Sequence, residues 1–315
     1  MTKRIKIGTR GSKLALWQAN WAKQALEALH PSIDAALVII KTKGDKITDV
    51  PLARIGGSAL FVKELEQALE DMRIDIAVHS MKDMPSAIPE KLRIGAVPER
   101  ESPRDVIISR DNLPFDRLPP GARIGTSSLR RQAQLLHARP DLTVVSLRGN
   151  LDTRIRKLEV EDLDAIVVAA AGVLRLGFEH RITQHLDETL MLPAACQGAL
   201  CIEIRKDDTE AARLTAPLDH PLSHTAVRGE RAFLRRLGGS CQVPMASYGT
   251  ILKETLTLQG LVASLQGTSI LRDSVSGPAD DPERLGNLLA DRLIERGANT
   301  ILKEILAETS CHEKR

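Results

Sequence analysis

The chain has 315 residues, more than one compact core usually holds, so its length predicts two or three domains. Its 44 lysines and arginines nearly balance 41 aspartates and glutamates, and the formal net charge of +3 excludes a global field that would favour nucleic acid or a membrane surface. Aromatic residues make up 2% of the sequence, which leaves few rings on which bases can stack.

Short β-like runs alternate with amphipathic helices at the start of the chain. The pattern predicts strands at residues 5–9, 35–41 and 74–79. A first helix is predicted from apolar residues at helical spacing: Leu14, Trp17, Trp21, Ala25 and Leu29. A second helix, residues 60–72, is predicted to bury one face that carries Phe61, Leu65, Ala68 and Met72. Residues 42–58 hold several Gly, Asp and Pro without a sustained period, which is typical of a long loop.

The same alternation continues in the middle of the chain. Strands are predicted at residues 123–126, 143–147 and 164–169, with a helix at residues 128–138. The last of these strands is nearly all apolar, as expected for a strand buried on both faces. Strand-helix-strand alternation predicts α/β layers with parallel sheets. Two such units, divided near residues 98–105, account for the chain up to about residue 217.

The pattern changes in the last third of the chain. Residues 255–263 and 269–276 are predicted to form antiparallel strands joined across Gln266-Gly267, and a helix at residues 223–237 precedes them. The closing stretch, residues 281–308, is predicted to be helical. This segment therefore favours a smaller α+β domain.

Cysteine usage and the N-terminal sequence indicate the compartment. The first ten residues contain no apolar core of a signal peptide, and no run approaches the about 18 apolar residues of a membrane span. The cysteines Cys196, Cys201, Cys241 and Cys311 form no CxxC pair, which favours reduced thiols and disfavours a zinc site. We therefore expect a cytoplasmic globular protein without a structural metal.

A carboxylate follows one predicted strand directly. Residues 74–79 run into Ser80-Met-Lys-Asp83, and ligands of open α/β sheets bind beyond the carboxyl ends of the strands. Asp83 can stabilise a cation or move a proton there, with its pKa held down by Lys82. The alternative is that Asp83 only organises the turn before Pro85.

Arginines and hydroxyl residues follow several other predicted strands. Thr126, Ser127 and Ser128 stand where a helix begins, and Arg130 and Arg131 oppose the dipole of its first turn. Other members of this set are Arg10, Ser12, Arg148, Arg154 and Arg156. Single arginines are often only solvated, but guanidinium groups at successive strand ends predict a cleft for a polycarboxylate or phosphorylated small molecule.

Cys241 differs from the other cysteines because it lies in a loop of small residues, Gly238-Gly-Ser-Cys-Gln-Val-Pro244. Glycines let such a loop approach a ligand, and Arg235 and Arg236 can lower the pKa of the thiol. The alternative is an idle loop cysteine. His79 has no Ser/His/Asp order or paired-histidine spacing around it, and the chain shows no phosphate-binding glycine fingerprint.

Seven segments, in the same order, resemble the porphobilinogen deaminases (hydroxymethylbilane synthases) along nearly the whole chain. They are Gly8-Thr-Arg-Gly-Ser12 with Leu14-Ala-Leu-Trp-Gln18, Phe61-Val-Lys-Glu-Leu-Glu66, His79-Ser-Met-Lys-Asp83, Gly125-Thr-Ser-Ser-Leu-Arg-Arg131, Leu147-Arg-Gly-Asn150, Gln197-Gly-Ala199 and Gly239-Ser-Cys-Gln-Val-Pro244. Each segment alone is a modest signal, and seven in order are very specific.

The resemblance implies an α/β fold with two lobes like those of type II periplasmic binding proteins, with parallel-rich sheets, plus a small α+β C-terminal domain. The implied domains are residues 1–99 with 200–217, residues 105–193, and residues 222–315. The implied enzyme is a monomeric transferase of tetrapyrrole (porphyrin and haem) synthesis. It joins four porphobilinogen molecules head to tail with loss of ammonia, and then releases hydroxymethylbilane by hydrolysis.

The resemblance also assigns roles to residues. Asp83 is the implied catalyst, and Cys241 the implied attachment point of a dipyrromethane cofactor held by a thioether. The implied cofactor-binding residues are Lys82, Thr126, Ser128, Arg130, Arg131, Arg154 and Gln197. The implied substrate-binding residues are Arg10, Ser12, Arg148 and Arg175. Porphobilinogen is the implied partner, with no nucleic acid, membrane or metal.

One position departs from the family pattern. Many members carry a lysine where this chain has Ser58, and Arg54 is the alternative residue for that contact. Two rival functions remain open at this point. One is a binding protein that clamps an anion without chemistry, and the other is a nucleic-acid binder that uses Arg130 and Arg131.

Overall fold

The computed structural model describes residues 3–42, 62–239 and 243–312. The chain forms two compact units: unit 1 is Met1–Glu101 with Ala199–Thr225, and unit 2 is Ser102–Gly198 with Ala226–Arg315. The three-domain division stays a prediction, since unit 2 includes most of the two later ranges. Within the described ranges, no helix is both long and apolar enough to cross a membrane.

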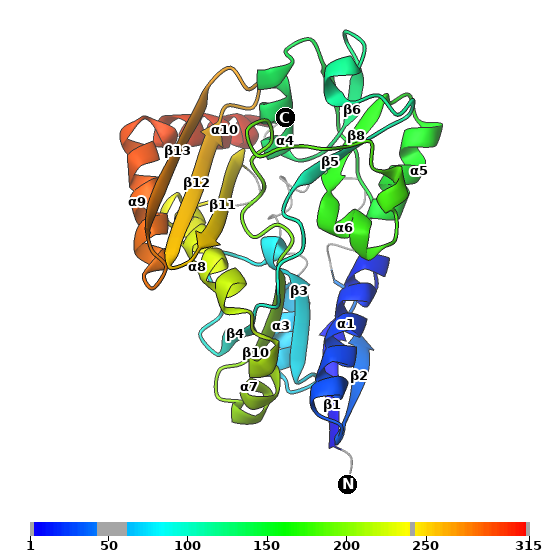
Figure 1. Cartoon of the computed structure of the whole chain (residues 1–315), viewed down its shortest axis with the longest axis vertical. Coiled ribbons are helices and arrows are strands. Elements are labelled where there is room, and N and C mark those ends of the chain that lie inside the picture. The colour runs from blue at the N-terminus through cyan, green and yellow to red at the C-terminus, as the bar shows by residue number, and fades with distance from the viewer. Residues whose placement is uncertain (1–2, 43–61, 240–242, 313–315) are drawn as a thin grey trace. The chain divides into compact units, whose positions relative to one another are not determined.

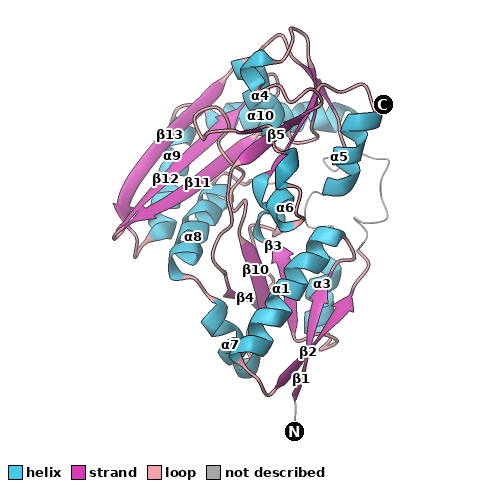
Figure 2. Ribbon diagram, turned by 45° about the vertical axis from the view of Figure 1, so that its right-hand side comes forward, coloured by secondary structure: helices cyan, strands magenta, loops and turns pink. Residues whose placement is uncertain are grey.

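Unit 1 is built on a five-stranded sheet with the order β2-β1-β3-β10-β4. Strand β10 runs antiparallel to both of its neighbours, while β1 is parallel to β2 and to β3. Figure 2 shows α1 lying along this sheet. The elements are β1 (Lys3–Thr9), α1 (Lys13–Leu29), β2 (Ile33–Ile39), α3 (Lys63–Glu70), β3 (Ile76–Ser80), β4 (Leu92–Ala96), β10 (Leu200–Arg205) and α7 (Thr209–Thr215).

The two faces of this sheet have separate cores. Ile76 and Val78 pack with Ile202, Ile204 and the buried residues of α1. Ala77 packs with Leu65, Ala68 and Leu69 of α3 in the other core. Because side chains alternate along a strand, the odd-numbered residues of β3 and β10 face α3.

Unit 2 contains a second five-stranded sheet with the order β7-β6-β8-β5-β9. Strand β6 is parallel to β7 and β8, whereas β5 is antiparallel to β8 and β9. The elements are β5 (Asp105–Ser109), β6 (Arg123–Gly125), α4 (Leu129–Ala138), β7 (Thr143–Val145), α5 (Leu151–Val160), β8 (Ala165–Ala169), α6 (Ala170–Arg175) and β9 (Gln184–His185).

Unit 2 also contains a three-stranded antiparallel sheet, β11-β12-β13. Helix α9 packs on one face of it, with α8 and α10 adding to the same core (Figure 1). Phe233 of α8 is fully buried in this core. The elements are α8 (Pro221–Arg236), β11 (Met245–Leu252), β12 (Thr255–Ala263), β13 (Ile270–Pro278), α9 (Pro282–Glu295) and α10 (Ala298–His312).

The structure confirms the α/β class, the parallel-rich sheets and the α+β character of the C-terminal part. The helical stretch predicted at residues 281–308 is confirmed and consists of two helices, separated at Gly297, whose φ is +99°. Two details of the sequence prediction are wrong. Met72 lies beyond α3 with a φ of +56° and is 72% exposed, so it is not on the buried face. Strands β4, β5, β9 and β11 were not predicted from the sequence. Most of the predicted loop at 42–58, and Phe61, fall outside the described residues.

Candidate active site

In unit 1, the ends of two parallel strands place a group of predicted residues on one edge of the sheet. Strands β1 and β3 pair in register, with Ile7 opposite Ile76, so their carboxyl ends lie at the same edge. The buried hydroxyl of Thr9 donates to the carbonyl of Ala15 at 3.0 Å. Ser12 caps α1 by accepting the Ala15 N–H at 3.3 Å. These two contacts fix the turn that carries the half-buried Arg10.

Asp83 ends a short 3-10 helix, Met81–Asp83, that follows β3 directly. The Met81 N–H donates to the carbonyl of Ala199 at 2.9 Å, and Met81 and Met84 are buried. Lys82 and Asp83 are half-buried. Among the described residues no hydrogen bond to the Asp83 carboxylate is found that would tie it into its own turn. The turn is therefore anchored by methionines and backbone, and the alternative turn-organising role of Asp83 has no such contact to support it.

In unit 2, hydroxyl groups gather at the carboxyl ends of the parallel strands β6 and β7. The Thr126 N–H donates to the carbonyl of Val145 at 2.8 Å, which joins the two strand ends. The Ser127 hydroxyl donates to the carbonyl of Leu147 at 2.8 Å. Ser128 caps α4 by accepting the Arg131 N–H at 3.4 Å. These contacts fix the turn that leads into a ten-residue helix, and the N-terminus of a helix favours an anion.

Arg130 and Arg131 both reach Asp105, a fully buried residue of β5 that the sequence analysis did not select. Arg130 Nη1 lies 2.7 Å from Asp105 Oδ2, and Arg131 donates to Oδ1 from Nε at 3.0 Å and from Nη2 at 2.7 Å. Burial alone would raise the pKa of Asp105, but the charges of Arg130 and Arg131, with hydrogen bonds from Arg130 and Gln197, hold it well below its usual range. The cluster is two buried cations and one buried anion.

The charges of Arg130, Arg131 and Asp105 sum to one net positive charge, and all three residues are buried. Burial, and then the neighbouring Arg131, lower the pKa of Arg130, while Asp105 raises it. An uncompensated buried guanidinium is costly, and an added anion lowers that cost. The residues present therefore fit a ligand that carries carboxylates.

The turn at Cys196–Gly198 connects Asp105 to two other parts of unit 2. Gln197 Nε2 donates to Asp105 Oδ1 at 2.9 Å, and Arg175 Nη2 donates to the carbonyl of Gly198 at 2.7 Å. Cys196 has a φ of +63°, unusual for a residue with a side chain. Its N–H donates to the carboxylate of the fully buried Glu230, which also accepts the Gly249 N–H at 2.8 Å. The predicted Gln197 and Arg175 thus belong to one hydrogen-bonded network.

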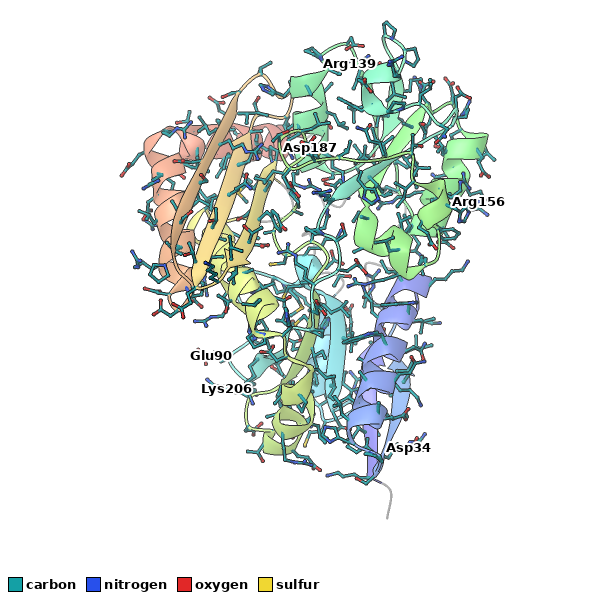
Figure 3. The ribbon with its side chains drawn as sticks, viewed as in Figure 1. Asp34, Glu90, Arg139, Arg156, Asp187 and Lys206 are labelled. Carbon is teal, nitrogen blue, oxygen red and sulfur yellow. The ribbon has the colours of Figure 1, made fainter. Side chains whose placement is uncertain are left out.

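The remaining arginines follow β7. Arg148 and Arg154 are half-buried, and Arg154 Nε donates to the carbonyl of Gly149 at 2.8 Å. Gly149 has a φ of +114°, and a Cβ there would lie 2.8 Å from Thr153 Cγ2, so glycine is required. Arg156 is exposed on α5 (Figure 3).

Three residues of the sequence analysis, Cys241, Ser58 and Arg54, fall outside the described residues. Cys196 and Cys201 are buried free thiols. In the described part of the chain, no group of three or more His, Cys, Asp or Glu side chains is arranged to hold a metal ion. The sequence analysis did not select the buried acids Asp105, Glu230 and Glu203. The available signal was an acidic residue inside or beside an apolar segment, which must find a partner when it is buried.

Fold and residues together define an α/β protein with the Asp83 carboxylate at a strand end of unit 1 and a group of hydroxyl and guanidinium side chains at strand ends of unit 2. Residues 5–213 match the family model described as porphobilinogen deaminase, dipyromethane cofactor binding domain, and residues 224–295 match the model of the C-terminal domain of the same family. The chain belongs to the porphobilinogen deaminase family. The predicted enzyme class, a transferase, and the predicted dipyrromethane cofactor are confirmed at the level of the family.

Similar proteins agree along almost the whole chain. The porphobilinogen deaminase of Syntrophotalea carbinolica is 55% identical over 298 residues, which are 95% of each chain. That of Pelobacter propionicus is 54% identical over 96% of this chain and 97% of its own. A periplasmic solute-binding protein of Desulfovibrio salexigens matches 70% of this chain and 73% of its own at a TM-score of 0.42 and 10% identity. That last likeness is too low to carry any conclusion.

Proposed function

We propose that this protein joins four porphobilinogen molecules head to tail, with loss of ammonia, and releases hydroxymethylbilane by hydrolysis. The chain grows on a dipyrromethane primer attached to Cys241 by a thioether. The proposal is supported by relatives of 54–55% identity that bear the name porphobilinogen deaminase. It is also supported by the family model for a cofactor-binding domain over residues 5–213. The product serves tetrapyrrole synthesis.

The observation that carries the proposal is the pair of buried guanidinium groups facing one carboxylate in unit 2. Each pyrrole of substrate and product bears an acetate and a propionate, so carboxylates accumulate as the chain grows. Arg130 and Arg131 supply the net positive charge, and Thr126 and Ser128 supply hydroxyl groups at the start of α4. Lys82, Arg154 and Gln197 complete the set that would hold the primer, whose terminal pyrrole supplies the carbon to which substrate is joined.

Asp83 performs the catalytic role in this proposal. Loss of ammonia leaves a cation on the substrate, and a carboxylate fixed at the end of β3 stabilises that charge and accepts or returns a proton. Arg10, Ser12, Arg148 and Arg175 bind the carboxylates of the incoming substrate. Because Met81 and Met84 anchor the turn, Asp83 loses little freedom when the cation forms.

The decisive test is the intact mass of the denatured protein. The expected result is a covalent excess equal to two pyrrole units in the natural chain, retained in Cys311→Ser and lost in Cys241→Ser. An active preparation with an unmodified mass would contradict the primer on Cys241. An unmodified and inactive protein that still binds anions would favour the simple binding function.

We also propose that the enzyme works as a cytoplasmic monomer. Cys196 and Cys201 are both buried as free thiols, which supports a reducing compartment. Light scattering on the purified protein should give the mass of one 315-residue chain, and a mass of two chains would overturn the monomer.

A further inference from the structure

Behind the Asp83 turn, two adjacent strands of unit 1 bury an ionisable pair. His79 of β3 and Glu203 of β10 lie on the face that packs against α3, since Cys201 is opposite His79 and Glu203 is opposite Ala77. His79 Nε2 lies 3.0 Å from Glu203 Oε2. The histidine is 5% exposed and the glutamate 0%. The proposed chemistry does not use either residue.

Helix α3 adds a third ionisable group to this pair. Glu66 is 9% exposed, and the charges of Glu203 and His79 both act on its carboxyl group. Glu66 Oε1 and Glu203 Oε1 are buried and accept no hydrogen bond within the described residues. We call Glu66, His79 and Glu203 the acid-histidine cluster. It has two carboxyl groups and a single imidazole to balance them.

Among the described residues, further titratable groups lie beside the cluster on α3 and β10. On α3, Glu70 raises and Lys63 lowers the pKa of Glu66. On β10, the buried Cys201 stands opposite His79, and Arg205, on the same face, pairs with Asp75 and Asp208. On β1, Gly8 brings no side-chain charge. Lys63 is the added cation that acts on the second carboxylate, and its effect is smaller than those of burial and Glu203.

Burial is the largest cause that raises the pKa of Glu66, the charge of Glu203 comes second, and His79 opposes both. The resulting pKa is about 7. Near neutral pH the Glu66 carboxyl group therefore gains and loses a proton. Protonation also lets the Glu66 carboxyl donate a hydrogen bond.

The cluster is joined to the Asp83 turn through the backbone. His79 is followed directly by Ser80, and Ser80 pairs with Leu200 of β10. The next residue, Met81, donates to the carbonyl of Ala199, which directly precedes β10. A change in the distance between β3 and β10 at His79 and Glu203 therefore reaches the turn within two residues.

We propose that the acid-histidine cluster is a buried proton-sharing device that positions the Asp83 turn, with His79 as the positioning residue. When Glu66 is protonated, β3 and β10 are held together and the turn is fixed. When Glu66 loses its proton, two like charges face each other and the turn loosens. The effect on catalysis rests on the proposed function, whereas the effect on the turn does not.

The first experiment uses His79→Phe, which keeps a ring and removes the base. Hydrogen exchange of the peptide covering residues 80–84 should become about tenfold faster, and kcat should fall about tenfold or more with KM within about twofold. Asp71→Asn removes an exposed carboxylate just after α3 and should change neither the hydrogen exchange of this peptide nor kcat. Unchanged exchange in His79→Phe would overturn the proposal. Faster exchange in a protein without any deaminase activity would count against the proposed function alone.

The second experiment uses Glu66→Gln and does not require His79→Phe to fold. In the natural protein, exchange at residues 80–84 should rise between pH 6 and pH 8 about threefold more than the ordinary chemical dependence of amide exchange, because Glu66 ionises in that range. In Glu66→Gln this excess should vanish, and in Asp71→Asn it should persist. Equal pH dependence in the natural protein and Glu66→Gln would contradict the cluster as a proton-sharing device.

Discussion

The two five-stranded sheets have the same design and opposite buried charge. Each has three neighbouring parallel strands followed by one antiparallel strand, which is β10 beside β3 in unit 1 and β5 beside β8 in unit 2. Each antiparallel strand carries a fully buried acid, Glu203 or Asp105. Glu203 meets one histidine and a second acid, whereas Asp105 meets two arginines. One architecture therefore provides a place for a proton and, elsewhere, a place for an anion.

The largest expected effect is the loss of the acid in unit 2. Asp105→Asn leaves two buried guanidinium groups without their carboxylate, and breaking such a buried pair costs about 3–5 kcal/mol of unfolding free energy. Urea denaturation at pH 7 measures it. Asp141→Asn, which removes the carboxylate of an exposed pair with Arg139, is the control and should shift the midpoint little. Equal urea midpoints for the two variants would contradict the prediction that the buried Asp105 stabilises unit 2 more than an exposed acid does.

The next largest effect is a loss of activity with no change in folding stability. Asp83→Asn should fold normally, because the turn is anchored by Met81 and Met84, and should lose about 3 kcal/mol of transition-state stabilisation, which is more than about a hundredfold in kcat. Steady-state kinetics with a parallel melting curve separate the two outcomes. An asparagine variant that keeps most of its kcat would remove Asp83 as the catalyst.

The buried acids Glu66 and Asp105 predict opposite responses of folding stability to pH. The pKa of Glu66 rises from 4.5 to about 7 on folding, so the folded state binds more protons and stability falls, by about 3 kcal/mol at most, as pH rises through that range. The pKa of Asp105 is depressed, so its contribution is present above its ordinary value of 3.8 and is lost as pH falls below it. Unfolding of Glu66→Gln at pH 5 and pH 8 should lack the first loss.

The smallest effect compares two arginines on one helix. Arg154→Gln removes a half-buried guanidinium beside the turn at Gly149 from the set that holds the primer, and it should lower kcat/KM about tenfold, the size of one charge-assisted hydrogen bond. Arg156→Gln removes an exposed guanidinium from α5 and should leave kcat/KM unchanged. Similar kcat/KM values for both variants would remove Arg154 from the set that holds the primer.

Local sequence was sufficient for the residues at strand ends and insufficient for the residues inside strands. Asp83, Ser12 and Ser128 could be found because turn and capping residues follow apolar strands at recognisable spacing. Strand β12 was predicted with its exact bounds, since antiparallel strands joined by a short turn carry a local signal.

The direction of the antiparallel strands β5 and β10 cannot be predicted from local sequence patterns. Whether β5 and β10 run with or against their neighbours depends on where a distant chain segment returns, and apolar runs read the same in either direction. The arginines illustrate the consequence. Arg130 and Arg131 were singled out because their charges oppose the dipole of the helix, but their partner Asp105 could not be named before the tertiary structure placed it beside them.

The insertion of β10 between β3 and β4 has a consequence for how the protein is made. Strand β4 ends at Ala96, and β10 begins only at Leu200. When the ribosome has produced the first hundred residues, the edges of β3 and β4 that later pair with β10 have no partner strand. Unpaired edges are where chains adhere to one another, so the nascent chain is open to aggregation until residue 205 emerges. The Asp83 turn, which binds the carbonyl of Ala199, is completed at the same late moment of synthesis.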